Sequence, residues 1–567
     1  MKRVNLLMLG ILFLTVANAK NIFVDPTNGL NVEGGGATWE TAVKTLSAAI
    51  SNSITGFVAG DNIYVKGGTI DYSVAFATGN YNFSSTANYY GSCDLTNNGT
   101  STVRTTYDAD GNGIVESWEF QDPTTISSIV TCSTGNVTAF VINNAGYTFN
   151  GFTLTHVATN TTAYYLRSIV VNGNVNFINC SMINSNTVPL TSTGTNAFPA
   201  ALFFYGAGAN VNNCLFEKNT VSFTNSDAQT NSYAAFIAIS ATTTSRGIAA
   251  NSIVRNNSIT ASFTKTPTSI TSKNGGMLLT TNTAAGYSTI IKNCLIYNNE
   301  MVYTGTGAAP ATVGIGASLQ AGFSASGNNS DSIINCTIAN NRATGFSCAG
   351  MMVFTGNSPT HKILNNALWN NKLNDGTISN VDLTNFPANS LFMKNVTNAG
   401  NNSIADNGTT ITSNDYTLSD VNNTGNRPLF VSPTATVGYN FSDNTISTSV
   451  WKLNSSSYLI GKGIALNNNV TDKAGISFLS TPSVGAYEWV SPTTVFNQLN
   501  NEVVSIKSIK NAIVTQYEGD LEVVSLAGSI IRNSKVTSGE VVYLPAGIYI
   551  ARTKVAGVVN SIKVLIL

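Results

Sequence analysis

A nine-residue motif recurs six times in the middle of the chain, and it constrains the fold more than any other feature. Each copy has Asn at its third position, then Cys, Ser or Asn, and an apolar residue two positions later. The motif Asn residues are Asn179, Asn213, Asn251, Asn293, Asn335 and Asn365. Their spacings are 34, 38, 42, 42 and 30 residues. Self-similarity at this period is typical of solenoids and propellers.

Side-chain alternation favours the solenoid. In the fourth copy, Ile291 and Asn293 share one parity, and Cys294, Ile296 and Asn298 share the other. Two short strands that meet at a bend would point all five inward. We therefore predict a parallel β-helix with the motif Asn at equivalent corners, bonded to the backbone of the bend and to one another along the axis. The propeller signature and the spacing of leucine-rich repeats are both missing.

Apolar stretches before the motifs indicate a third strand in each coil, at residues 275–279, 316–320 and 349–354. The polar segments 185–198 and 264–274 are expected to leave the coil as surface loops. A single coil cannot bury its own apolar face, so stacking has to supply the core.

Both ends of such a stack require caps. At the N-terminal end, residues 60–70 read as a turn and the first strand, and residues 482–489 are expected to close the far end. An apolar stripe at helical spacing precedes the first strand, and it predicts a capping helix. The residues of this stripe are Trp39, Val43, Leu46 and Ile50.

The first nineteen residues have the pattern of a signal peptide. A basic start at Lys2 and Arg3 precedes an apolar run at 6–16 and a small-x-small site that ends at Ala19. The run is short for a membrane span, so we expect cleavage and a mature chain that begins near Lys20, although a retained anchor is the alternative. No other stretch is apolar enough for a transmembrane helix, and we expect none in the mature chain.

The charge balance limits the possible partners. The chain has 28 Lys and Arg and 28 Asp and Glu, so its formal net charge is zero. A nucleic-acid binder needs a basic surface to neutralise phosphates, so nucleic acid is an unexpected partner. The same balance argues against electrostatic docking on an anionic membrane.

Seven cysteines are present, which is an odd number for an exported protein and leaves at least one without a disulfide partner. No CxxC pair occurs, so neither a zinc site nor a redox motif is indicated. Four of the seven share the position after the motif Asn, which indicates packing inside the coils. These four are Cys180, Cys214, Cys294 and Cys336.

The segment 108–119, "DADGNGIVESWE", matches a calcium-binding loop at every position. In such loops, positions 1, 3, 5 and 12 supply side-chain oxygens, position 7 a carbonyl and position 9 a water-mediated contact, while position 6 is Gly. The predicted Ca²⁺ ligands are Asp108, Asp110, Asn112, Ile114, Glu116 and Glu119. An extended stretch precedes the loop and Pro123 follows it, so a structural ion is expected rather than a helical switch. An acidic surface turn is the alternative.

Candidate catalytic residues are few. No signature of paired carboxylates or of a lyase base is present, and the two histidines, His156 and His361, read as structural or surface residues. Charged residues beside the motifs occupy unmatched positions and read as scattered surface charge. They are Glu217, Lys218, Arg255 and Lys292. The sequence assigns no catalytic residue.

The segments "IFVDPTNG", "WETAVKTLSAAI" and "GDNIYVKGGT", the Asn-Cys motifs, "PLFV" (428–431) and "VGAYEW" (484–489) together resemble secreted pectin-lyase-like proteins of Bacteroidetes-type bacteria. The resemblance spans about residues 20–490 and implies a right-handed parallel β-helix. It implies little about activity, because that superfamily mixes polysaccharide lyases, hydrolases and adhesins.

Residues 495–567 change character: apolar strands alternate with Gly-containing turns, which indicates a small β-sandwich. The stretches 544–550 and 563–565 resemble C-terminal sorting domains of type IX secretion. That resemblance implies the outer-membrane secretion machinery as a partner, and release or surface attachment. An ordinary β-domain that stabilises the end of the helix is the alternative.

These observations define three expected parts: a signal peptide at 1–19, a β-helix domain at 20–490 that carries the loop 108–119, and a C-terminal domain at 495–567. We expect an exported protein, secreted or on the outer-membrane surface, that binds glycans or acts as an adhesin, with polysaccharide as the partner. A polysaccharide lyase or glycoside hydrolase is the first alternative, and a purely structural surface protein is the second.

Overall fold

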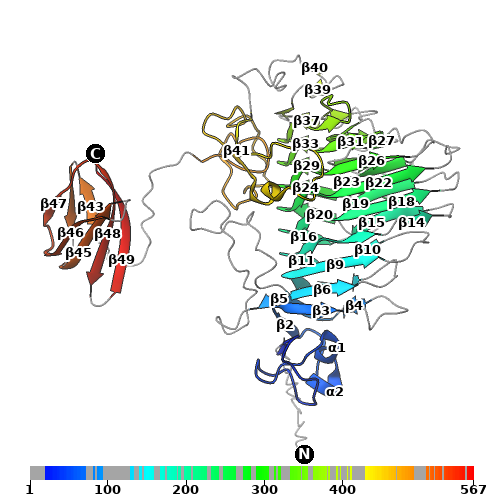
Figure 1. Cartoon of the computed structure of the whole chain (residues 1–567), viewed down its shortest axis with the longest axis horizontal. Coiled ribbons are helices and arrows are strands. Elements are labelled where there is room, and N and C mark those ends of the chain that lie inside the picture. Colours follow the sequence, from blue (N-terminus) through cyan, green and yellow to red (C-terminus); the bar gives the residue numbers. More distant parts are fainter. Residues whose placement is uncertain are drawn as a thin grey trace, which may run out of the picture. The chain divides into compact units, whose positions relative to one another are not determined.

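A computed structural model of the chain divides into two compact units, residues 1–489 and residues 490–567 (Figure 1). The structure describes residues 19–71, 81–83, 86–93, 128–132, 140–143, 146–158, 167–172, 175–187, 190–192, 197–205, 209–225, 232–241, 247–263, 273–282, 289–304, 312–313, 317–320, 332–345, 348–354, 362–379, 381–382, 391–393, 396–397, 405–406, 409–410, 428–467, 469–490, 506–509, 511–515, 518–525, 529–555 and 558–566.

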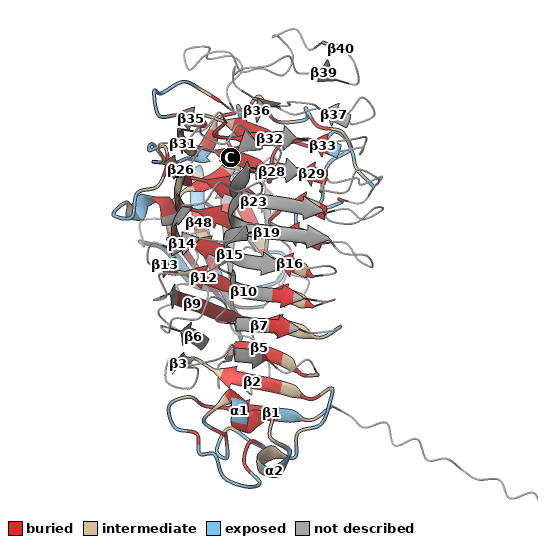
Figure 2. Ribbon diagram, turned by 90° about the vertical axis from the view of Figure 1, so that its right-hand side faces the viewer, coloured by how far each residue is buried: buried red, intermediate tan, exposed pale blue. Residues whose placement is uncertain are grey.

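The first unit is a stack of coils built from parallel strands (Figures 1 and 2). One coil illustrates the path: β24 (Thr289–Lys292), a corner, β25 (Leu295–Tyr297), a second corner, β26 (Glu300–Tyr303), and then β28 (Ala317–Gln320). Each strand pairs with its counterparts in the neighbouring coils, so the coils form four sheets, here numbered 1 to 4 in the order of this path. The stacked parallel sheets are compatible with the predicted β-helix.

Sheet 1 has eleven parallel strands. They are β1 (Asn21–Val24), β2 (Asn62–Lys66), β5 (Asn88–Cys93), β8 (Thr148–Asn150), β11 (Asn176–Ile178), β16 (Asn210–Asn212), β20 (Gly247–Ala250), β24, β29 (Ser332–Ile334), β33 (Lys362–Leu364) and β37 (Leu391–Met393). Sheet 2 contains the short strands between the two corners. They are β3 (Gly68–Asp71), β6 (Ser128–Cys132), β9 (Phe152–Ala158), β12 (Ser181–Ile183), β17 (Leu215–Glu217), β21 (Ile253–Arg255), β25, β30 (Thr337–Ala339), β34 (Ala367–Trp369) and β38 (Val396–Thr397).

Sheet 3 follows the second corner. Its strands are β13 (Asn186–Thr187), β14 (Leu190–Ser192), β18 (Thr220–Asn225), β22 (Ser258–Phe263), β26, β31 (Arg342–Thr344) and β35 (Lys372–Leu373). Sheet 4 holds β4 (Tyr81–Phe83), β7 (Phe140–Asn143), β10 (Arg167–Asn172), β15 (Ala197–Tyr205), β19 (Ser232–Ala241), β23 (Lys273–Asn282), β27 (Thr312–Val313), β28, β32 (Met351–Phe354) and β36 (Val381–Asp382). The three predicted third strands lie in sheet 4, as β23, β28 and β32.

The motif Asn residues occupy equivalent corners, as predicted. All six have positive φ, between 50° and 57°. Asn tolerates this left-handed region better than other non-Gly residues, because its short polar side chain bonds locally. A second corner with positive φ follows five residues after each first corner. Its residues are Asn184, Lys218, Asn256, Asn298, Asn340 and Asn370.

The predicted inward orientation of the corner Asn side chains is wrong. Asn293 bonds the amide of Asn469 and the carbonyl of Thr471, and Asn298 bonds carbonyls near residue 437, all of which belong to a segment that packs outside the coils. The left-handed bend turns both Asn side chains outward. The prediction that stacked copies bond one another is confirmed, since Asn293 donates to the Oδ1 of Asn251 at 3.2 Å.

Inside the coils, a second set of amides forms a buried ladder that the motif did not reveal. Its members lie six residues after the first corners. They are Asn219, Asn257, Asn299, Asn341 and Asn371, and all five are fully buried. Asn299, for example, donates to the carbonyl of Val254 at 2.9 Å and to the Oδ1 of Asn341 at 3.0 Å. These bonds satisfy the amides across three coils, so the ladder fixes the stacking register.

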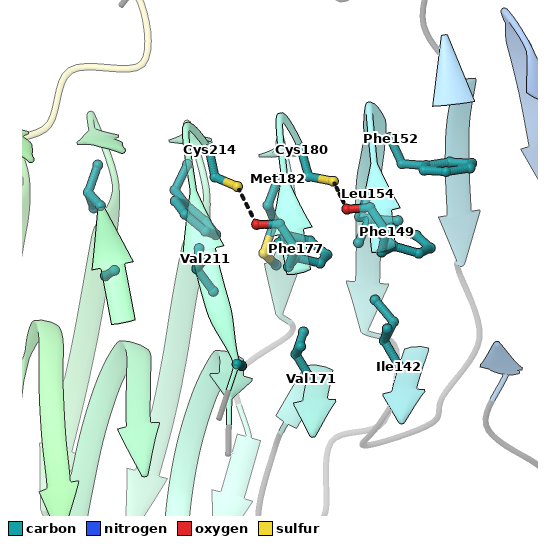
Figure 3. Close-up of a cluster of buried hydrophobic side chains, with 14 of the residues drawn as sticks. Ile142, Phe149, Phe152, Leu154, Val171, Phe177, Cys180, Met182, Val211 and Cys214 are labelled. Atoms are coloured by element: carbon teal, nitrogen blue, oxygen red, sulfur yellow. Dashed lines mark hydrogen bonds between the residues drawn. The ribbon is translucent and has the colours of Figure 1, made fainter. Parts of the chain in front are cut away.

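Apolar side chains from all four sheets form one buried cluster in the coil interior. Phe149 and Phe177 stack at 5.5 Å between adjacent coils. The buried thiols of Cys180 and Cys214 lie beside them and donate to the carbonyls of these same two residues (Figure 3). The packing role predicted for the four motif cysteines is confirmed, because all four are buried thiols in this cluster.

The N-terminal cap differs from the predicted single helix. Only α1 (Leu46–Ala49) and α2 (Asn52–Thr55) are helical, and the predicted apolar stripe extends beyond them. Val43 forms an isolated bridge with Val24, and both are buried in the core of the stack. The side chain of Thr45 accepts from the N–H of Ala48 and so starts α1 at this point, which excludes the preceding residues from the helix.

Residues 428–489, here called the returning segment, contain β41 (Phe430–Ser432), the 3₁₀ helix η2 (Asn444–Thr448) and β42 (Val450–Leu453). The segment forms a second apolar cluster with the outward side chains of sheet 2, such as Leu295 and Ala367. Gly485 donates to the carbonyl of Asn365 at 2.8 Å. Residues 482–489 therefore cover the side of the coils, and the prediction that they cap the end of the stack is wrong.

The second unit contains two antiparallel sheets. One consists of β43 (Ile506–Ile509), β44 (Ala512–Thr515) and β47 (Val541–Tyr543). The other consists of β45 (Gly519–Ser525), β46 (Ile530–Val536), β48 (Gly547–Val555) and β49 (Val558–Ile566). Residues of both sheets, including Ile513 and Leu521, form one buried cluster. A short hairpin of β39 (Ala405–Asp406) and β40 (Thr409–Thr410) lies in the first unit. Across the described residues, no helix has the length and apolar character needed to cross a membrane.

Candidate functional site

A row of aromatic rings lies on the outer face of sheet 1 in the first three coils. Strand pairing aligns Phe23 of β1 with Tyr64 of β2, and Tyr64 with Tyr90 of β5. Successive ring centroids are 5.8 Å and 5.0 Å apart, with planes inclined by 25° and 15°. The row faces outward because the alternate residues, such as Ile63, point into the core.

Trp39 extends this row at its N-terminal end. Its ring centroid lies 4.8 Å from that of Phe23 at an angle of 54°. Phe23 and Tyr64 are buried, whereas Trp39 and Tyr90 are only half-buried and reach the surface at the two ends. Burial raises the pKa of Tyr90, so its hydroxyl keeps its proton at neutral pH. We call these four residues the aromatic row.

A ladder of amides runs parallel to the aromatic row, two residues earlier in each strand. Asn62 donates to the Oδ1 of Asn21 and Asn88 donates to the Oδ1 of Asn62, both at 3.1 Å. The ladder continues at Thr148, whose N–H donates to Asn88 at 3.0 Å. A carboxamide has two N–H groups and two acceptor lone pairs, so each ladder bond leaves capacity for a further partner.

An ion pair borders the aromatic row on its other side. The ammonium of Lys66 lies 2.9 Å from Oδ2 of Asp25, and the N–H groups of Thr27 and Asn28 donate to Oδ1. Burial opposes ionisation of Asp25, but the bond from Lys66 and the two backbone N–H groups outweigh it and lower the pKa of this carboxyl. Asp25 therefore stays ionised at neutral pH, and the pair holds the end of β1 against β2.

This arrangement has the chemistry of a site for a linear polyhydroxylated ligand. Aromatic side chains combine a large apolar face with a polar tip, and they contact the apolar face of a partner while amides bond its hydroxyls. Neighbouring strands lie about 4.7–4.9 Å apart, so each coil repeats the same groups at a regular step along the axis. A ligand with its own repeat can contact the amides of successive coils, which are exposed at Asn21 and half-buried at Asn62 and Asn88.

The charged residues beside the motifs are more ordered than the sequence suggested. Glu217 and Arg255 occupy paired positions in β17 and β21 and form an ion pair at 3.1 Å, with each residue 9 % exposed. The prediction of scattered surface charge is therefore wrong for these two residues. Arg255 also donates to the hydroxyl of Tyr297, which in turn donates to the carbonyl of Ile446. This buried network attaches the returning segment to the coils.

The remaining candidate residues bring no catalytic constellation together. His156 lies on β9 and is fully buried, which agrees with its predicted structural role. Lys218 occupies a second corner 5.8 Å from the Phe441 ring centroid, and Lys292 is half-buried on β24. His361 lies outside the described residues. Within the described ranges, no group of three His, Cys, Asp or Glu side chains could hold a metal ion.

The predicted calcium loop also lies outside the described residues. All of its ligands belong to the undescribed range 94–127, so the structure says nothing of their geometry. They are Asp108, Asp110, Asn112, Ile114, Glu116 and Glu119.

No protein-family model matches the chain, and a search of the curated proteins finds no match.

The sequence contained a signal for the aromatic row that the motif search missed. Phe23, Tyr64 and Tyr90 each occupy the third position of a strand that starts with Asn, namely Asn21, Asn62 and Asn88. Their spacings of 41 and 26 residues differ from those of the motif coils. The shared Asn-x-aromatic pattern would have aligned them.

Proposed function

We propose that the first unit binds glycan chains along the outer face of sheet 1, through the amide ladder and the two accessible ends of the aromatic row, Trp39 and Tyr90. The observation that carries this proposal is the axial alignment of Phe23, Tyr64 and Tyr90 with the Asn ladder. The described charges beside the aromatic row, Lys66 and Asp25, pair with each other, which suits a neutral polysaccharide better than a polyanion. The polysaccharide is thus the proposed partner of a surface-associated adhesin or binding protein.

Tyr90→Leu tests the proposal, because Leu keeps apolar bulk but removes the flat ring at the accessible end. The matched control is Tyr439→Leu, which alters a half-buried tyrosine in the returning segment. Affinity electrophoresis in gels that contain neutral plant and microbial polysaccharides measures binding. We expect Tyr90→Leu to weaken binding of the retained glycan by about two- to tenfold, since an aromatic contact contributes about 0.5–1.5 kcal/mol. Equal retention of the two variants, or no retention of the parent chain by any polysaccharide, contradicts the proposal.

The alternative is a polysaccharide lyase or hydrolase. The ion pair of Glu217 and Arg255 lies in the buried network that attaches the returning segment, which favours a structural role for these charges over a catalytic one. A depolymerisation assay on the same polysaccharides distinguishes the two: an increase in reducing ends, or in the absorbance of unsaturated sugar products, would assign an enzyme.

For the second unit we propose a role in sorting across the outer membrane, with release or attachment at the cell surface. Its compactness supports the proposal, because residues 490–567 form a unit with a core of their own. Deletion of residues 495–567 should leave the chain in the periplasm of its host, as judged by cell fractionation. Normal delivery of the truncated chain would leave a plain stabilising domain as the explanation.

For residues 108–119 we propose a structural Ca²⁺ site, on the basis of the loop pattern alone. We expect an extracellular-type affinity, about 10⁻⁴–10⁻³ M. Calcium at tenfold excess over Kd should then raise the free energy of unfolding by about 1–2 kcal/mol. Thermal melts with calcium and with chelator should differ for the parent chain and coincide for Glu119→Gln. The same calcium response in both proteins would mean that the loop is an acidic turn.

A further inference from the structure

Lys20 joins three elements at the start of the described chain. Its carbonyl accepts from the N–H of Asn62 at 2.9 Å, next to the first pairing of β1 with β2. Its ammonium donates to the carbonyls of Thr55 and Gly56 at the C-terminal end of α2. Lys20 is half-buried, whereas the preceding Ala19 is exposed. The carbonyl and the ammonium of Lys20 therefore tie β2 and α2 together.

The backbone nitrogen of Lys20 faces a buried carboxylate. It lies 2.9 Å from Oδ1 of Asp61, which is 0 % exposed, and Oδ2 of Asp61 accepts from the N–H of Val58. Within the described residues, no cationic side chain forms an ion pair with Asp61. A buried carboxylate without a counter-charge is costly, because burial removes the water that would stabilise it.

We propose that hydrolysis of the peptide bond between Ala19 and Lys20 creates the missing counter-charge, so that the new α-ammonium of Lys20 forms an ion pair with Asp61. Water adds across the bond under the action of an export-pathway endopeptidase: the C–N bond breaks, Ala19 keeps the oxygen of the water and leaves as a carboxylate, and the nitrogen of Lys20 gains both protons of the water and becomes an ammonium. The acceptor is already at hydrogen-bond distance, so the bond from a neutral amide becomes an ion pair without rearrangement. Cleavage thereby stabilises the contact between the start of the first strand, the cap and Asp61.

The pH dependence follows from the charge of the new terminus. An α-amino group has an unfolded pKa of about 7.7–8.0, and a buried carboxylate partner raises this pKa in the folded state. The contribution of the ion pair to stability is fully present below the unfolded pKa. It is lost as pH rises through the folded pKa. Asp61 accepts directly from the nitrogen of the new terminus, and the ammonium of Lys20 is a second positive charge on the same residue.

A double-mutant cycle on the otherwise full chain tests the proposal. One protein starts at Lys20 and a second starts at Ala19, which moves the ammonium one residue away from Asp61. Both are also made with Asp61→Asn. We expect an amine-acylating reagent at pH 7.5 to modify the terminus of the Lys20 protein at least tenfold more slowly than that of the Ala19 protein, with mass spectrometry as the readout. The Asp61→Asn substitution should abolish that difference.

A second measurement avoids the Asp61 variant in case it folds poorly. The denaturation midpoint of the Lys20 protein should exceed that of the Ala19 protein at pH 6.5, and the two should converge above about pH 10. Equal acylation rates, a gap between midpoints that persists at high pH, or an exported chain that starts elsewhere than Lys20 would each overturn the proposal.

Discussion

Two coil corners with the same backbone differ in what lies outside them. Asn213 and Asn293 have φ of 52° and 53°, and each donates to the corner Asn of the preceding coil. Asn213 is half-buried, whereas Asn293 is 2 % exposed and also bonds Asn469 and Thr471 of the returning segment. The motif therefore determines the bend, and a distant segment determines whether the bend is covered.

The outward residues of sheet 2 also differ between coils that the returning segment covers and coils that it does not. In the covered coils these positions hold Leu295 and Tyr297, which join the apolar cluster of the returning segment. In the coil of Asn213 they hold Leu215, which joins the same cluster, and Glu217, which does not; in the coil of Asn179 they hold Ser181 and Ile183, and neither is part of it. An outward apolar pair on a corner strand thus indicates a cover.

The largest expected effect comes from removal of the central side chain of the cover. Trp451 is 1 % exposed and its ring lies 5.2 Å from Tyr297 and 5.0 Å from Phe430. Trp451→Ala should lower the free energy of unfolding by about 3–5 kcal/mol, because it leaves a large cavity. Limited proteolysis should cut within residues 428–489 faster, while cleavage near Asn213 stays unchanged. Equal acceleration at both places would mean that the cover and the bare coils unfold together.

The corners themselves give a smaller and more direct contrast. Asn293→Leu places a bulky residue at positive φ and leaves the partners of Asn293 without its bonds, so a loss of about 1–3 kcal/mol from the bonds adds to about 1–2 kcal/mol of backbone strain. Asn213→Leu has the same strain with fewer lost bonds, and should cost about 1 kcal/mol less.

Chemical denaturation of the two corner variants measures this difference. Asn293→Gly serves as the control, since Gly relieves the strain and isolates the hydrogen-bond loss. Equal losses for Asn213→Leu and Asn293→Leu would show that the cover adds nothing at the corner.

The smallest effect concerns the pH dependence of the cover. Lys473 is 1 % exposed, and its ammonium donates to the carbonyl of Asn251 at 2.9 Å. Burial lowers the pKa of Lys473 to about 7, although Cys294 and Asp472 favour its charged form. Because the folded pKa lies below the unfolded value, the contribution of Lys473 to stability is present above the unfolded pKa and is lost as pH falls through 7.

The free energy of unfolding should therefore rise by about 1 kcal/mol between pH 8 and pH 9, near the limiting slope for one proton. Lys473→Met should flatten this rise, as measured by urea denaturation at the two pH values. This interval avoids the titration of Asp472, whose pKa burial raises to about 6. A variant that keeps the full slope would assign it to other groups.

The repeat was visible in the sequence because the bend restricts residue choice. Asn179 and its counterparts stand where φ is positive, and the cysteines stand where the interior leaves room for a small side chain. Contacts between residues far apart in the chain produce no repeated sequence pattern. Asn469 lies 176 residues from Asn293, and the motif says nothing of their pairing.

The aromatic row was missed for a related reason. Tyr64 and Tyr90 are aligned by strand pairing, yet their 26-residue separation does not match the later coils. The buried ladder was missed for another reason. Asn299 directly follows the corner residue Asn298, so of these two adjacent Asn side chains one points outward and the other points into the core. Alternation fails at a left-handed residue, because the bend reverses the side on which its side chain emerges.

The buried amide ladder has a consequence for how such a chain can change in length. Each amide of the ladder donates in the same direction along the axis. Asn257 accepts a hydrogen bond from Asn219 and donates one to Asn299, whatever the length of the loops between them. A segment from one corner to the next, such as residues 213–250, can thus be excised or duplicated as a unit, and the joined ends present the same atoms to each other. Genetic recombination can therefore add or remove one complete coil at a time, while the hydrogen bonds between neighbouring coils stay the same.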